Sequence, residues 1–539
     1  MKSLALPAAL VLCAAARAAS VAVVVPEDSY GTSLGRHAAR WLQSLQIAAD
    51  VVPAADISTR LADKKVAFLV TPKGDAAQVA ALRAFHARGG KSFVFYSSSP
   101  QLAALMGVKL GAYKKPVGAA TYSRIDFTPN VLHGAPISIV QTSANIASAS
   151  PRAGASVLAE WRDRAGRPTG DAAILATPSG WWMTHVLLAD GDEQAKAQLL
   201  AAAVASCIPG SWNYERHLAQ RTEELSRLRT YALAQKPRAG EIRATWDHSG
   251  QGLYPGDWPR TIRELKRWGI TDLFVNVAGA GFAHYPSKHL PASAICTAEG
   301  DQLAAALKAA ANSGVRVHAW ILCFTATRAT PGRLDDFSRR GWRVKDKKGR
   351  LTEYLSPSNS ALREHLLNAI TELGSRYAVA GVHLDFVRWY EGAALPANAV
   401  ESVTGFVSAA RLRLKAVRPA AWLTTAVFGK YPTCVSSVGQ DWESWLNAGF
   451  VDYAVPMNYL EDNAKYSLLL ARQCRDTAHA NKIISGIGVT ANESRLSARQ
   501  VIDQVRLARG AGAAGVAFFD LDYVLVNDVL PFLRLGLFK

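Results

Sequence analysis

The stretch Gly381-Val-His-Leu-Asp-Phe-Val-Arg-Trp-Tyr390 has the pattern of a buried β-strand that ends in a carboxylate, with an arginine close behind it. Because side chains alternate across a strand, His383 and Asp385 share one face, and the apolar residues between them share the other. In a parallel barrel the carboxyl ends of the strands form the active-site face, so a charged group there is typical of catalysis. A structural use stays open, in which Asp385 caps the next helix or pairs with Arg388.

Strand patterns like this one recur along residues 240–539, with helical patterns between them. Eight strand and helix units within about 300 residues predict a (β/α)8 TIM barrel. A doubly wound sheet is the alternative architecture. The predicted strands cover residues 242–246, 272–277, 315–322, 381–386, 423–428, 453–459, 483–489 and 515–519.

Residues 19–210 also alternate between strand and helix patterns, with strands at 21–25, 66–70 and 92–96 and a helix at 75–88. This order predicts a parallel sheet with helices on its faces, as in flavodoxin-like α/β domains. The segment resembles the amidotransferase-like domains attached to carbohydrate enzymes. Their nucleophile would follow the third of these strands, where Tyr96-Ser97-Ser98-Ser99-Pro100 has no cysteine. We interpret the domain as non-catalytic, and a ligand-binding role stays open.

Two further segments frame this domain. Residues 1–18 combine Lys2, a short apolar run and Ala16-Arg17-Ala18, which is the pattern of a secretory signal peptide cleaved after Ala18. The run is too short for a stable membrane span, so we expect export to the periplasm or the extracellular space. Residues 211–239 hold a charged helical pattern at 213–234 and then Pro237 and Gly240, which predicts a helical connector.

The composition excludes several classes of protein. With 49% hydrophobic and 19% charged residues, the chain is typical of a globular protein. Its net charge of +18 would attract anionic partners. No basic helix is interleaved with aromatic residues and no reader motif is present, so we expect no nucleic-acid partner. Five cysteines remain after the predicted signal, without a C-x-x-C motif, so neither a disulfide framework nor a zinc knuckle is indicated, although one pair could form.

The barrel region resembles glycosyl-hydrolase-like family 10, a group of bacterial glycoside hydrolases. The resemblance implies a TIM barrel that cleaves glycosidic bonds and needs no cofactor. This family usually has a second acidic residue or a tyrosine after the strand aspartate, and Phe386 stands there instead, which weakens the case for a carboxylate pair on one strand. The matching pieces are Arg243-Ala-Thr-Trp246, Asp257-Trp258-Pro259, Trp342-Arg-Val-Lys-Asp-Lys-Lys-Gly-Arg350, Leu355-Ser-Pro-Ser-Asn-Ser-Ala-Leu-Arg363, Val382-His-Leu-Asp-Phe-Val-Arg388 and Val451-Asp-Tyr-Ala-Val-Pro-Met-Asn-Tyr459.

Glycoside hydrolysis normally uses one ionised and one protonated carboxyl group. The positive charge of Arg388 favours the ionised form of Asp385, so we assign Asp385 as nucleophile or stabiliser. The proton donor should lie elsewhere at the barrel mouth, in a setting that raises its pKa. The alternatives are that these other carboxylates complement a helix dipole or bond to a loop. The candidates are Glu461 and Asp462 after the sixth strand, and Asp520 and Asp522 after the eighth.

Aromatic and polar residues near the strand ends are candidates for holding a sugar, with core packing as the alternative for the aromatic ones. Trp389 and Tyr390 follow the end of the fourth strand and are predicted to form a flat platform. Residues 325–359, rich in arginine and lysine, are predicted to be a long loop that walls one side of the cleft. The substrate-binding candidates are Trp246, His248, Asn276, His318, Trp320, His383, Arg388, Trp389, Tyr390, Asn458 and Tyr459.

These patterns favour an exported glycoside hydrolase that acts on a poly- or oligosaccharide. Whether this substrate carries acidic groups stays open. One competing hypothesis is a metal-dependent hydrolase or deacetylase, with His248, His318, His383 and Asp385 as ligands, although their spacing is no metal signature. Another is a glycan-binding barrel without catalysis. The sugar, the linkage, the stereochemical outcome and the oligomeric state do not follow from the sequence.

Overall fold

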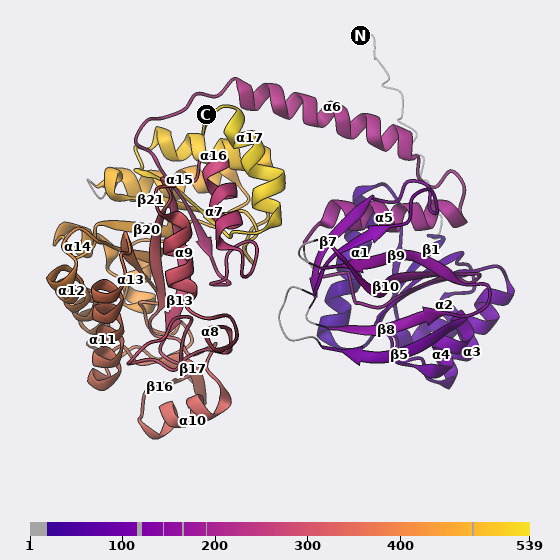
Figure 1. Cartoon of the computed structure of the whole chain (residues 1–539), viewed down its shortest axis with the longest axis horizontal. Helices are drawn as coiled ribbons and strands as arrows, with labels where there is room; N and C mark the ends of the chain where they lie inside the picture. The colour runs from indigo at the N-terminus through magenta and orange to yellow at the C-terminus, as the bar shows by residue number, and fades with distance from the viewer. Residues whose placement is uncertain (1–18, 116–120, 144, 164–165, 190, 477–478) are drawn as a thin grey trace, which may run out of the picture. The chain divides into compact units, whose positions relative to one another are not determined.

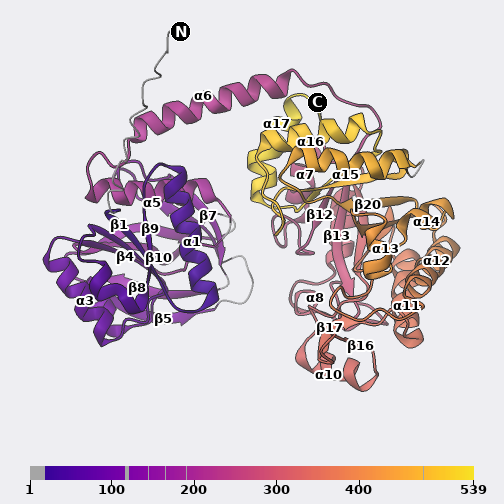
Figure 2. The same ribbon diagram turned by 180° about the vertical axis from the view of Figure 1, so that it is seen from behind.

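The computed structural model describes residues 19–115, 121–143, 145–163, 166–189, 191–476 and 479–539. The predicted signal peptide therefore lies outside the described residues. The chain forms two compact units, Met1–Thr222 and Glu223–Lys539. The boundary falls inside α6 (Tyr214–Leu233), a single long helix that matches the one predicted at 213–234 (Figures 1 and 2). In the described part of the chain, no helix combines the length and apolar character needed to cross a bilayer.

The amino-terminal unit begins as a parallel α/β sheet in the order β2-β1-β3-β4. The all-apolar sequences of β1 and β3 are fully buried, as expected of strands covered on both faces. The strands are β1 (Val21–Val25), β2 (Asp50–Pro53), β3 (Val66–Val70) and β4 (Lys91–Phe95). The helices are α1 (Ser29–Ser44), α2 (Ile57–Arg60), α3 (Ala76–Ala87) and α4 (Pro100–Met106). All three predicted strands and the predicted helix of this segment are present.

After α4 the expected alternation of strands and helices stops. In the described residues between α4 and α5 (Glu193–Cys207) the chain makes seven strands in succession, and most of them pair in antiparallel fashion. The nine-stranded sheet is consequently mixed, and a parallel sheet throughout residues 19–210 is not what the structure has. These strands are β5 (Val108–Lys114), β6 (Tyr122–Phe127), β7 (Ser138–Ser143), β8 (Ile146–Pro151), β9 (Ser156–Arg162), β10 (Pro168–Thr177) and β11 (Gly180–Met183).

The second unit is a closed barrel of eight parallel strands. Closure is complete because β12 pairs with β22 on one side and with β13 on the other. This confirms the predicted (β/α)8 architecture and excludes the doubly wound sheet. The barrel strands are β12 (Ile242–Asp247), β13 (Asp272–Gly279), β15 (Arg316–Leu322), β18 (Gly381–Asp385), β19 (Trp422–Phe428), β20 (Tyr453–Met457), β21 (Ile484–Gly488) and β22 (Gly515–Phe519). A two-residue strand, β14 (Phe282–Ala283), adds to β13.

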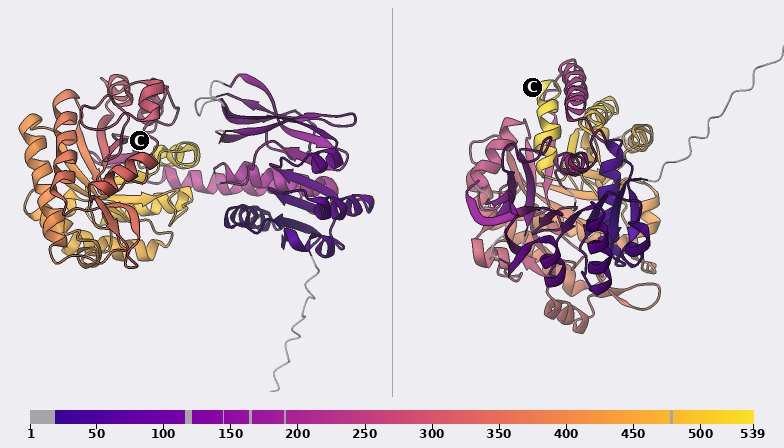
Figure 3. Two further views of the ribbon diagram at one scale, coloured as in Figure 1. Left: turned by 90° about the horizontal axis from the view of Figure 1, so that it is seen from below. Right: turned by 90° about the vertical axis from the view of Figure 1, so that its right-hand side faces the viewer.

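Helices surround the strands on the outside of the barrel (Figure 3). The alternation predicted for β18 is observed, because Val382 and Leu384 belong to the core between strands and helices, whereas a separate apolar cluster that includes Trp246 and Trp320 fills the lumen. The helices are α7 (Trp258–Arg267), α8 (Ala294–Glu299), α9 (Gln302–Ala310), α11 (Ser360–Arg376), α12 (Ala399–Val417), α13 (Thr433–Val438), α14 (Trp442–Asn447), α15 (Asn463–Asp476), α16 (Ala498–Gly510) and α17 (Leu530–Leu535).

Residues 325–359 differ from the predicted irregular loop. They contain α10 (Pro331–Arg339) and a hairpin of β16 (Arg343–Lys345) and β17 (Leu351–Leu355). Asp346 closes the hairpin turn by accepting hydrogen bonds from the backbone N–H groups of Lys348 and Arg350. The five cysteines of the described chain are free thiols.

Candidate functional site

A cavity of about 800 Å³ opens at the carboxyl ends of the barrel strands, and we call it the barrel cavity. Its wall combines aromatic rings with charged groups of both signs. The residues come from the ends of β12, β15, β18, β19, β20 and β22 and from the loops that follow them. They include Trp246, His248, Trp320, Arg328, Asp385, Phe386, Arg388, Glu391, Phe428, Lys430, Asn458, Tyr459, Glu493 and Phe519.

Asp385 lies in this wall, at the last position of β18, and is only 6% exposed. One oxygen, Oδ1, accepts a hydrogen bond of 2.6 Å from the N–H of Phe386 and lies 3.6 Å from Nη1 of Arg388. Burial raises the pKa of Asp385, whereas Arg388, the Phe386 N–H and the Trp320 indole lower it, and burial is the larger effect. Arg388 therefore acts in the expected direction, but the opposing effect of burial was not part of the expectation.

The chain turns sharply directly after Asp385. Phe386 has a φ of 49°, in the left-handed region that non-glycine residues rarely adopt. Its ring consequently packs against the cluster in the lumen and not on the outer face, where continued alternation would place it. Strained backbone of this kind is concentrated at functional sites.

Arg388 is held between two aromatic rings. Its guanidinium carbon lies 4.2 Å from the centroid of Phe386 and 4.5 Å from that of Phe428, distances at which cation–π attraction is effective. Its Nη1 is buried and has no hydrogen-bond acceptor among the described residues. The side chain is therefore fixed in place with donor capacity left over beside Asp385.

His383 lies below the cavity and is fully buried. Its Nε2 accepts a hydrogen bond of 2.9 Å from Nε1 of Trp246, and its Nδ1 lies 2.8 Å from Oγ1 of Thr424. An indole N–H can only donate, so His383 is neutral and its Nδ1–H donates to Thr424. Burial lowers the pKa of His383 well below its ordinary value. His383 therefore positions Trp246 and does not line the cavity.

Three other residues predicted to bind substrate are His248, Trp320 and Asn276, and only the first two line the barrel cavity. The ring of His248 lies 5.8 Å from that of Trp320 and 5.9 Å from that of Phe519. Burial, assisted by Arg328, lowers the pKa of His248 to about 4. Asn276 is buried without lining the cavity, and neither end of its amide has a hydrogen-bond partner in the described chain.

Tyr459 interacts electrostatically with three acidic groups of the site. It follows β20, lines the cavity and packs against Phe519 with ring centroids 5.4 Å apart. Burial raises the pKa of Tyr459 well above its ordinary value, and the charges of Asp385, Glu493 and Asp520 raise it further. These three carboxyl groups therefore all lie within electrostatic range of one hydroxyl. The neighbouring Asn458 also lines the cavity, but its amide is bonded to Gln473 and Ser485.

Glu461 and Asp462 lie outside the barrel cavity and have structural partners. Glu461 accepts a hydrogen bond of 3.0 Å from the N–H of Arg495. Asp462 accepts from the N–H groups of Ala464 and Lys465 in the first turn of α15. The contacts of Asp462 are those of the helix-dipole and capping alternative, whereas Glu461 bonds to a loop.

Asp520 directly follows Phe519, a wall residue, at the end of β22. Burial raises the pKa of Asp520 to about 7, with further contributions from the charges of Asp522 and Asp247. Its Oδ1 accepts a weak hydrogen bond of 3.3 Å from Oγ1 of Thr490. Asp522 accepts instead from the N–H of Leu525, and burial raises its pKa as well.

Two carboxylates of the cavity wall were not predicted from the sequence. Glu391 and Glu493 lie in loops, are exposed and line the cavity. Glu391 acts electrostatically on Arg388, and Glu493 acts on Tyr459. Neither follows a strand end closely, so a search at strand ends misses both.

His318, by contrast, is far from the site. It belongs to the first half of β15, and its Nε2 lies 2.8 Å from Oδ1 of Asp272, the first residue of β13. Asp272 also accepts a hydrogen bond of 2.7 Å from Arg316. This group lies at the amino-terminal end of the strands, the face of a TIM barrel that serves stability and not catalysis. The four-residue metal set is therefore not assembled, and the described residues contain no group of three or more potential ligands.

Trp389 and Tyr390 do not form the predicted platform. Trp389 is buried in the core between strands and helices, and its Nε1 donates to Oγ of Ser402. Tyr390 stacks on Tyr354 with ring centroids 4.3 Å apart and is absent from the cavity wall. The aromatic surface of the cavity comes instead from Trp246, Trp320, Phe386, Phe428, Tyr459 and Phe519.

No family model matches the sequence, and no curated protein matches it. Several solved structures of glycoside hydrolases are similar to part of the chain. An α-L-fucosidase isoenzyme 2 from Paenibacillus thiaminolyticus has 12% identity and a TM-score of 0.39 over 55% of this chain and 48% of its own. An endo-1,4-β-mannanase from Rhizomucor miehei has 10% identity and a TM-score of 0.39 over 52% of this chain and 86% of its own.

A GH18 chitinase from Cycas revoluta, solved with (GlcNAc)3, has 12% identity and a TM-score of 0.39 over 55% of this chain and 98% of its own. The chain thus spans about half the length of the fucosidase and nearly the whole of the chitinase.

Proposed function

We propose that the barrel is a glycoside hydrolase that cleaves a poly- or oligosaccharide at the barrel cavity. The observation that carries this proposal is the position of Asp385, a buried carboxyl group at the carboxyl end of β18 in a cavity lined with aromatic rings. The partly exposed rings that line the cavity, Phe386, Phe428, Tyr459 and Phe519, offer the flat apolar surface that a sugar ring needs. The cavity volume of about 800 Å³ is within the range of small-molecule sites.

In this mechanism the two carboxyl groups act in different protonation states. Asp385 acts in its ionised form, which Arg388 stabilises against the effect of burial, as nucleophile or stabiliser of the anomeric centre. Asp520, whose pKa is raised to about 7, is protonated in a substantial fraction of the molecules at neutral pH, and this form delivers its proton to the leaving oxygen. Glu493, which lines the cavity directly, is the competing candidate for the proton donor.

The substrate in this proposal carries acidic groups. Arg328, Arg388 and Lys430 line the cavity and give its wall positive charge. A sugar carboxylate would pair with these cationic side chains through charge-assisted hydrogen bonds. The net charge of +18 would attract such a polymer from a distance.

Three further assignments belong to the same proposal. The barrel is related to glycosyl-hydrolase-like family 10, and the amino-terminal unit is an amidotransferase-like domain that does not catalyse. Residues 1–18 direct export to the periplasm or beyond. Release of the protein into the medium or periplasm, together with an amino terminus at Ala19, would support the last of these.

The test is hydrolysis of a panel of acidic and neutral polysaccharides by the purified protein and by Asp385→Asn. We expect the variant to lose at least about a thousandfold in kcat/KM. Asp462→Asn is the matched control, because Asp462 caps a helix outside the cavity, and it should keep its activity. If the wild type binds a glycan of the panel but releases no product, the glycan-binding alternative replaces the proposal. If activity depends on a metal found by elemental analysis, the metal-dependent alternative replaces it.

A further inference from the structure

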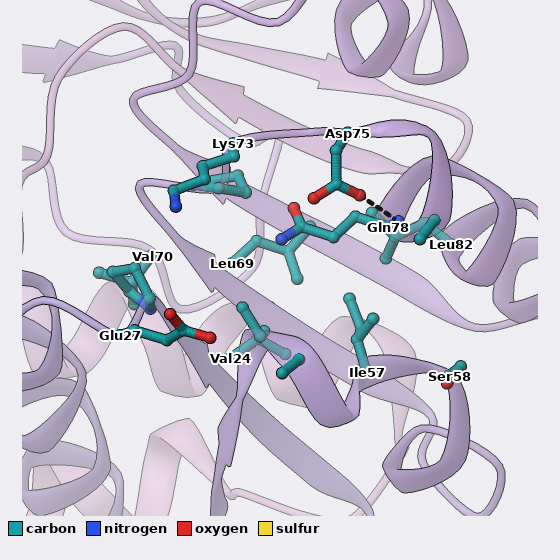
Figure 4. A pocket seen from close by; sticks show the side chains of 15 residues that line it. Val24, Glu27, Ile57, Ser58, Leu69, Val70, Lys73, Asp75, Gln78 and Leu82 are labelled. Carbon is teal, nitrogen blue, oxygen red and sulfur yellow. Dashed lines mark hydrogen bonds between the residues drawn. The ribbon is translucent and has the colours of Figure 1, made fainter.

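A second cavity, of about 250 Å³, lies in the amino-terminal unit, and we call it the amino-terminal cavity (Figure 4). It is built from the carboxyl ends of β1 and β3 and the segment that follows β2. In the strand order β2-β1-β3-β4 the chain passes from β1 to β2 on one side of β1, and then from β2 to β3 on the other side of β1. In open α/β sheets the crevice at such a reversal is the preferred place for a ligand.

The floor of this cavity is aliphatic. Val24, Ile57, Leu69 and Leu82 contribute to it, and each is at most 4% exposed. None of its lining residues is aromatic. The floor therefore fits a short branched or linear hydrocarbon group and lacks the flat surface on which sugar rings stack.

Gln78 presents a hydrogen-bond donor to the cavity. Its side chain is 8% exposed, and its Oε1 accepts a hydrogen bond of 3.0 Å from the N–H of Gly74. Since the backbone N–H can only donate, this bond fixes the orientation of the amide, with Oε1 toward Gly74 and Nε2 turned away from it. Figure 4 shows the amide extending from α3 into the space bordered by Lys73 and Glu27. Within the described part of the chain, Nε2 has no acceptor.

The rim of the cavity carries separate charges of both signs. Glu27 follows β1 and Lys73 follows β3, and both line the cavity. Among the described residues, neither has a hydrogen-bond or ion-pair partner, so the two charges do not neutralise each other. Asp75 also lines the cavity, with Oδ1 engaged by the N–H of Gln78 at the start of α3.

We propose that the amino-terminal cavity binds a free α-amino acid with an aliphatic side chain. Lys73 and Nε2 of Gln78 receive the carboxylate, Glu27 and Asp75 receive the ammonium group, and the side chain lies on the apolar floor. A small zwitterion satisfies both rim charges at once. A phosphate or nucleotide would instead bring negative charge against two carboxylates that one lysine cannot offset. The site lies in a different unit from the barrel cavity and does not depend on the proposed hydrolysis.

The experiment is calorimetric titration of the full-length protein with L-leucine and L-valine. We expect saturable binding with a Kd of about 1 mM or tighter. N-acetyl-L-leucine lacks the ammonium group and L-leucinamide lacks the carboxylate, so each should bind at least about tenfold more weakly. Lys73→Met should weaken leucine binding at least about tenfold and abolish the preference for leucine over leucinamide.

Lys65→Met is the matched control, because Lys65 is exposed immediately before β3, at the opposite end of the strand. It should bind leucine like the wild type. Thermal unfolding of each variant verifies the fold, and Glu27→Gln, which removes an exposed and unpaired charge, provides a second weakened variant. The proposal is overturned if no aliphatic amino acid binds, if a monosaccharide or inorganic phosphate binds in its place, or if Lys73→Met and Lys65→Met behave alike.

Discussion

Trp246 Nε1 donates a hydrogen bond of 2.9 Å to His383 Nε2, although the two residues are 137 positions apart in the chain. The bond crosses the lumen between β12 and β18 and orients an indole that lines the barrel cavity. It also fixes His383 in its neutral form, because a protonated ring would have no acceptor for the indole N–H. One buried imidazole thus determines the position of an aromatic wall residue.

Replacing His383 by leucine should destabilise the barrel. The change leaves the buried Trp246 N–H and Thr424 hydroxyl without their partner, which costs about 1–3 kcal/mol for an unsatisfied buried group. Denaturant unfolding at neutral pH measures this loss. His289→Leu alters an exposed histidine and serves as the control. Equal stability of the two variants would contradict the assigned hydrogen-bond network.

The same histidine should make the wild type less stable in acid. Burial lowers the pKa of His383 in the folded state, so below about pH 6.5 only the unfolded chain takes up the proton. The free energy of unfolding should therefore fall as the pH drops below that value. His383→Gln should reduce this dependence between about pH 7.5 and 5.5. An unchanged pH slope in the variant would show that other groups cause it.

Asp385→Asn should remove activity with little change in melting temperature. Two effects on stability oppose each other, because the neutral amide is cheaper to bury, whereas Arg388 loses its ion partner. The amide oxygen can still accept from the Phe386 N–H. Calorimetric unfolding and kcat/KM are measured on the same preparation. A large fall in melting temperature with activity retained would assign Asp385 a structural role.

The alkaline limb of the pH–rate profile should report Asp520. Its pKa of about 7 predicts that activity declines above neutral pH as the proton donor ionises. Asp520→Asn should abolish most activity. Asp522→Asn removes a negative charge that raises the pKa of Asp520, so the limb should move to lower pH. If both variants keep the wild-type profile and Glu493→Gln loses the limb, Glu493 is the donor.

Arg388→Met should discriminate between acidic and neutral substrates. Without the guanidinium, an acidic polysaccharide loses its ion partner, whereas the carboxyl-reduced form of the same polymer loses none. We expect kcat/KM to fall more steeply on the acidic form. Arg388→Lys keeps the charge but not the planar group that fits between Phe386 and Phe428, so it should rescue only part of the difference. An equal loss on both polymers would exclude recognition of the substrate's acidic groups by Arg388.

The sequence predicted the barrel well because each strand is a short apolar run between punctuated helices, as at residues 381–386 and 515–519. It did not predict the antiparallel strands that follow α4, whose half-buried patterns, such as that of β6, resemble irregular surface segments. The position of Trp389 was wrong for a local reason. Alternation ends at Phe386, where a positive φ reverses the direction of the following side chains.

The candidate site was predicted only where it depends on strands. Asp385 is the last residue of β18 and Trp246 the last but one of β12, and both were predicted because period-two alternation fixes their side. Glu391 and Glu493 lie in loops, and their approach to the cavity depends on loop conformation that no local pattern encodes. Carboxylates that follow a strand, such as Asp462, were indistinguishable in sequence from helix caps.

Closure of the barrel also affects association between molecules. Apart from the two-residue β14, every barrel strand has neighbours on both sides, so the ring offers no long exposed edge to a strand of another chain. The amino-terminal sheet, by contrast, ends in β2 and β7. β2 is only four residues long, begins with Asp50 and ends with Pro53, features that discourage edge-to-edge pairing. The barrel is therefore protected against edge-to-edge association by its closed topology. The amino-terminal sheet is protected at its β2 edge by the residues of that strand.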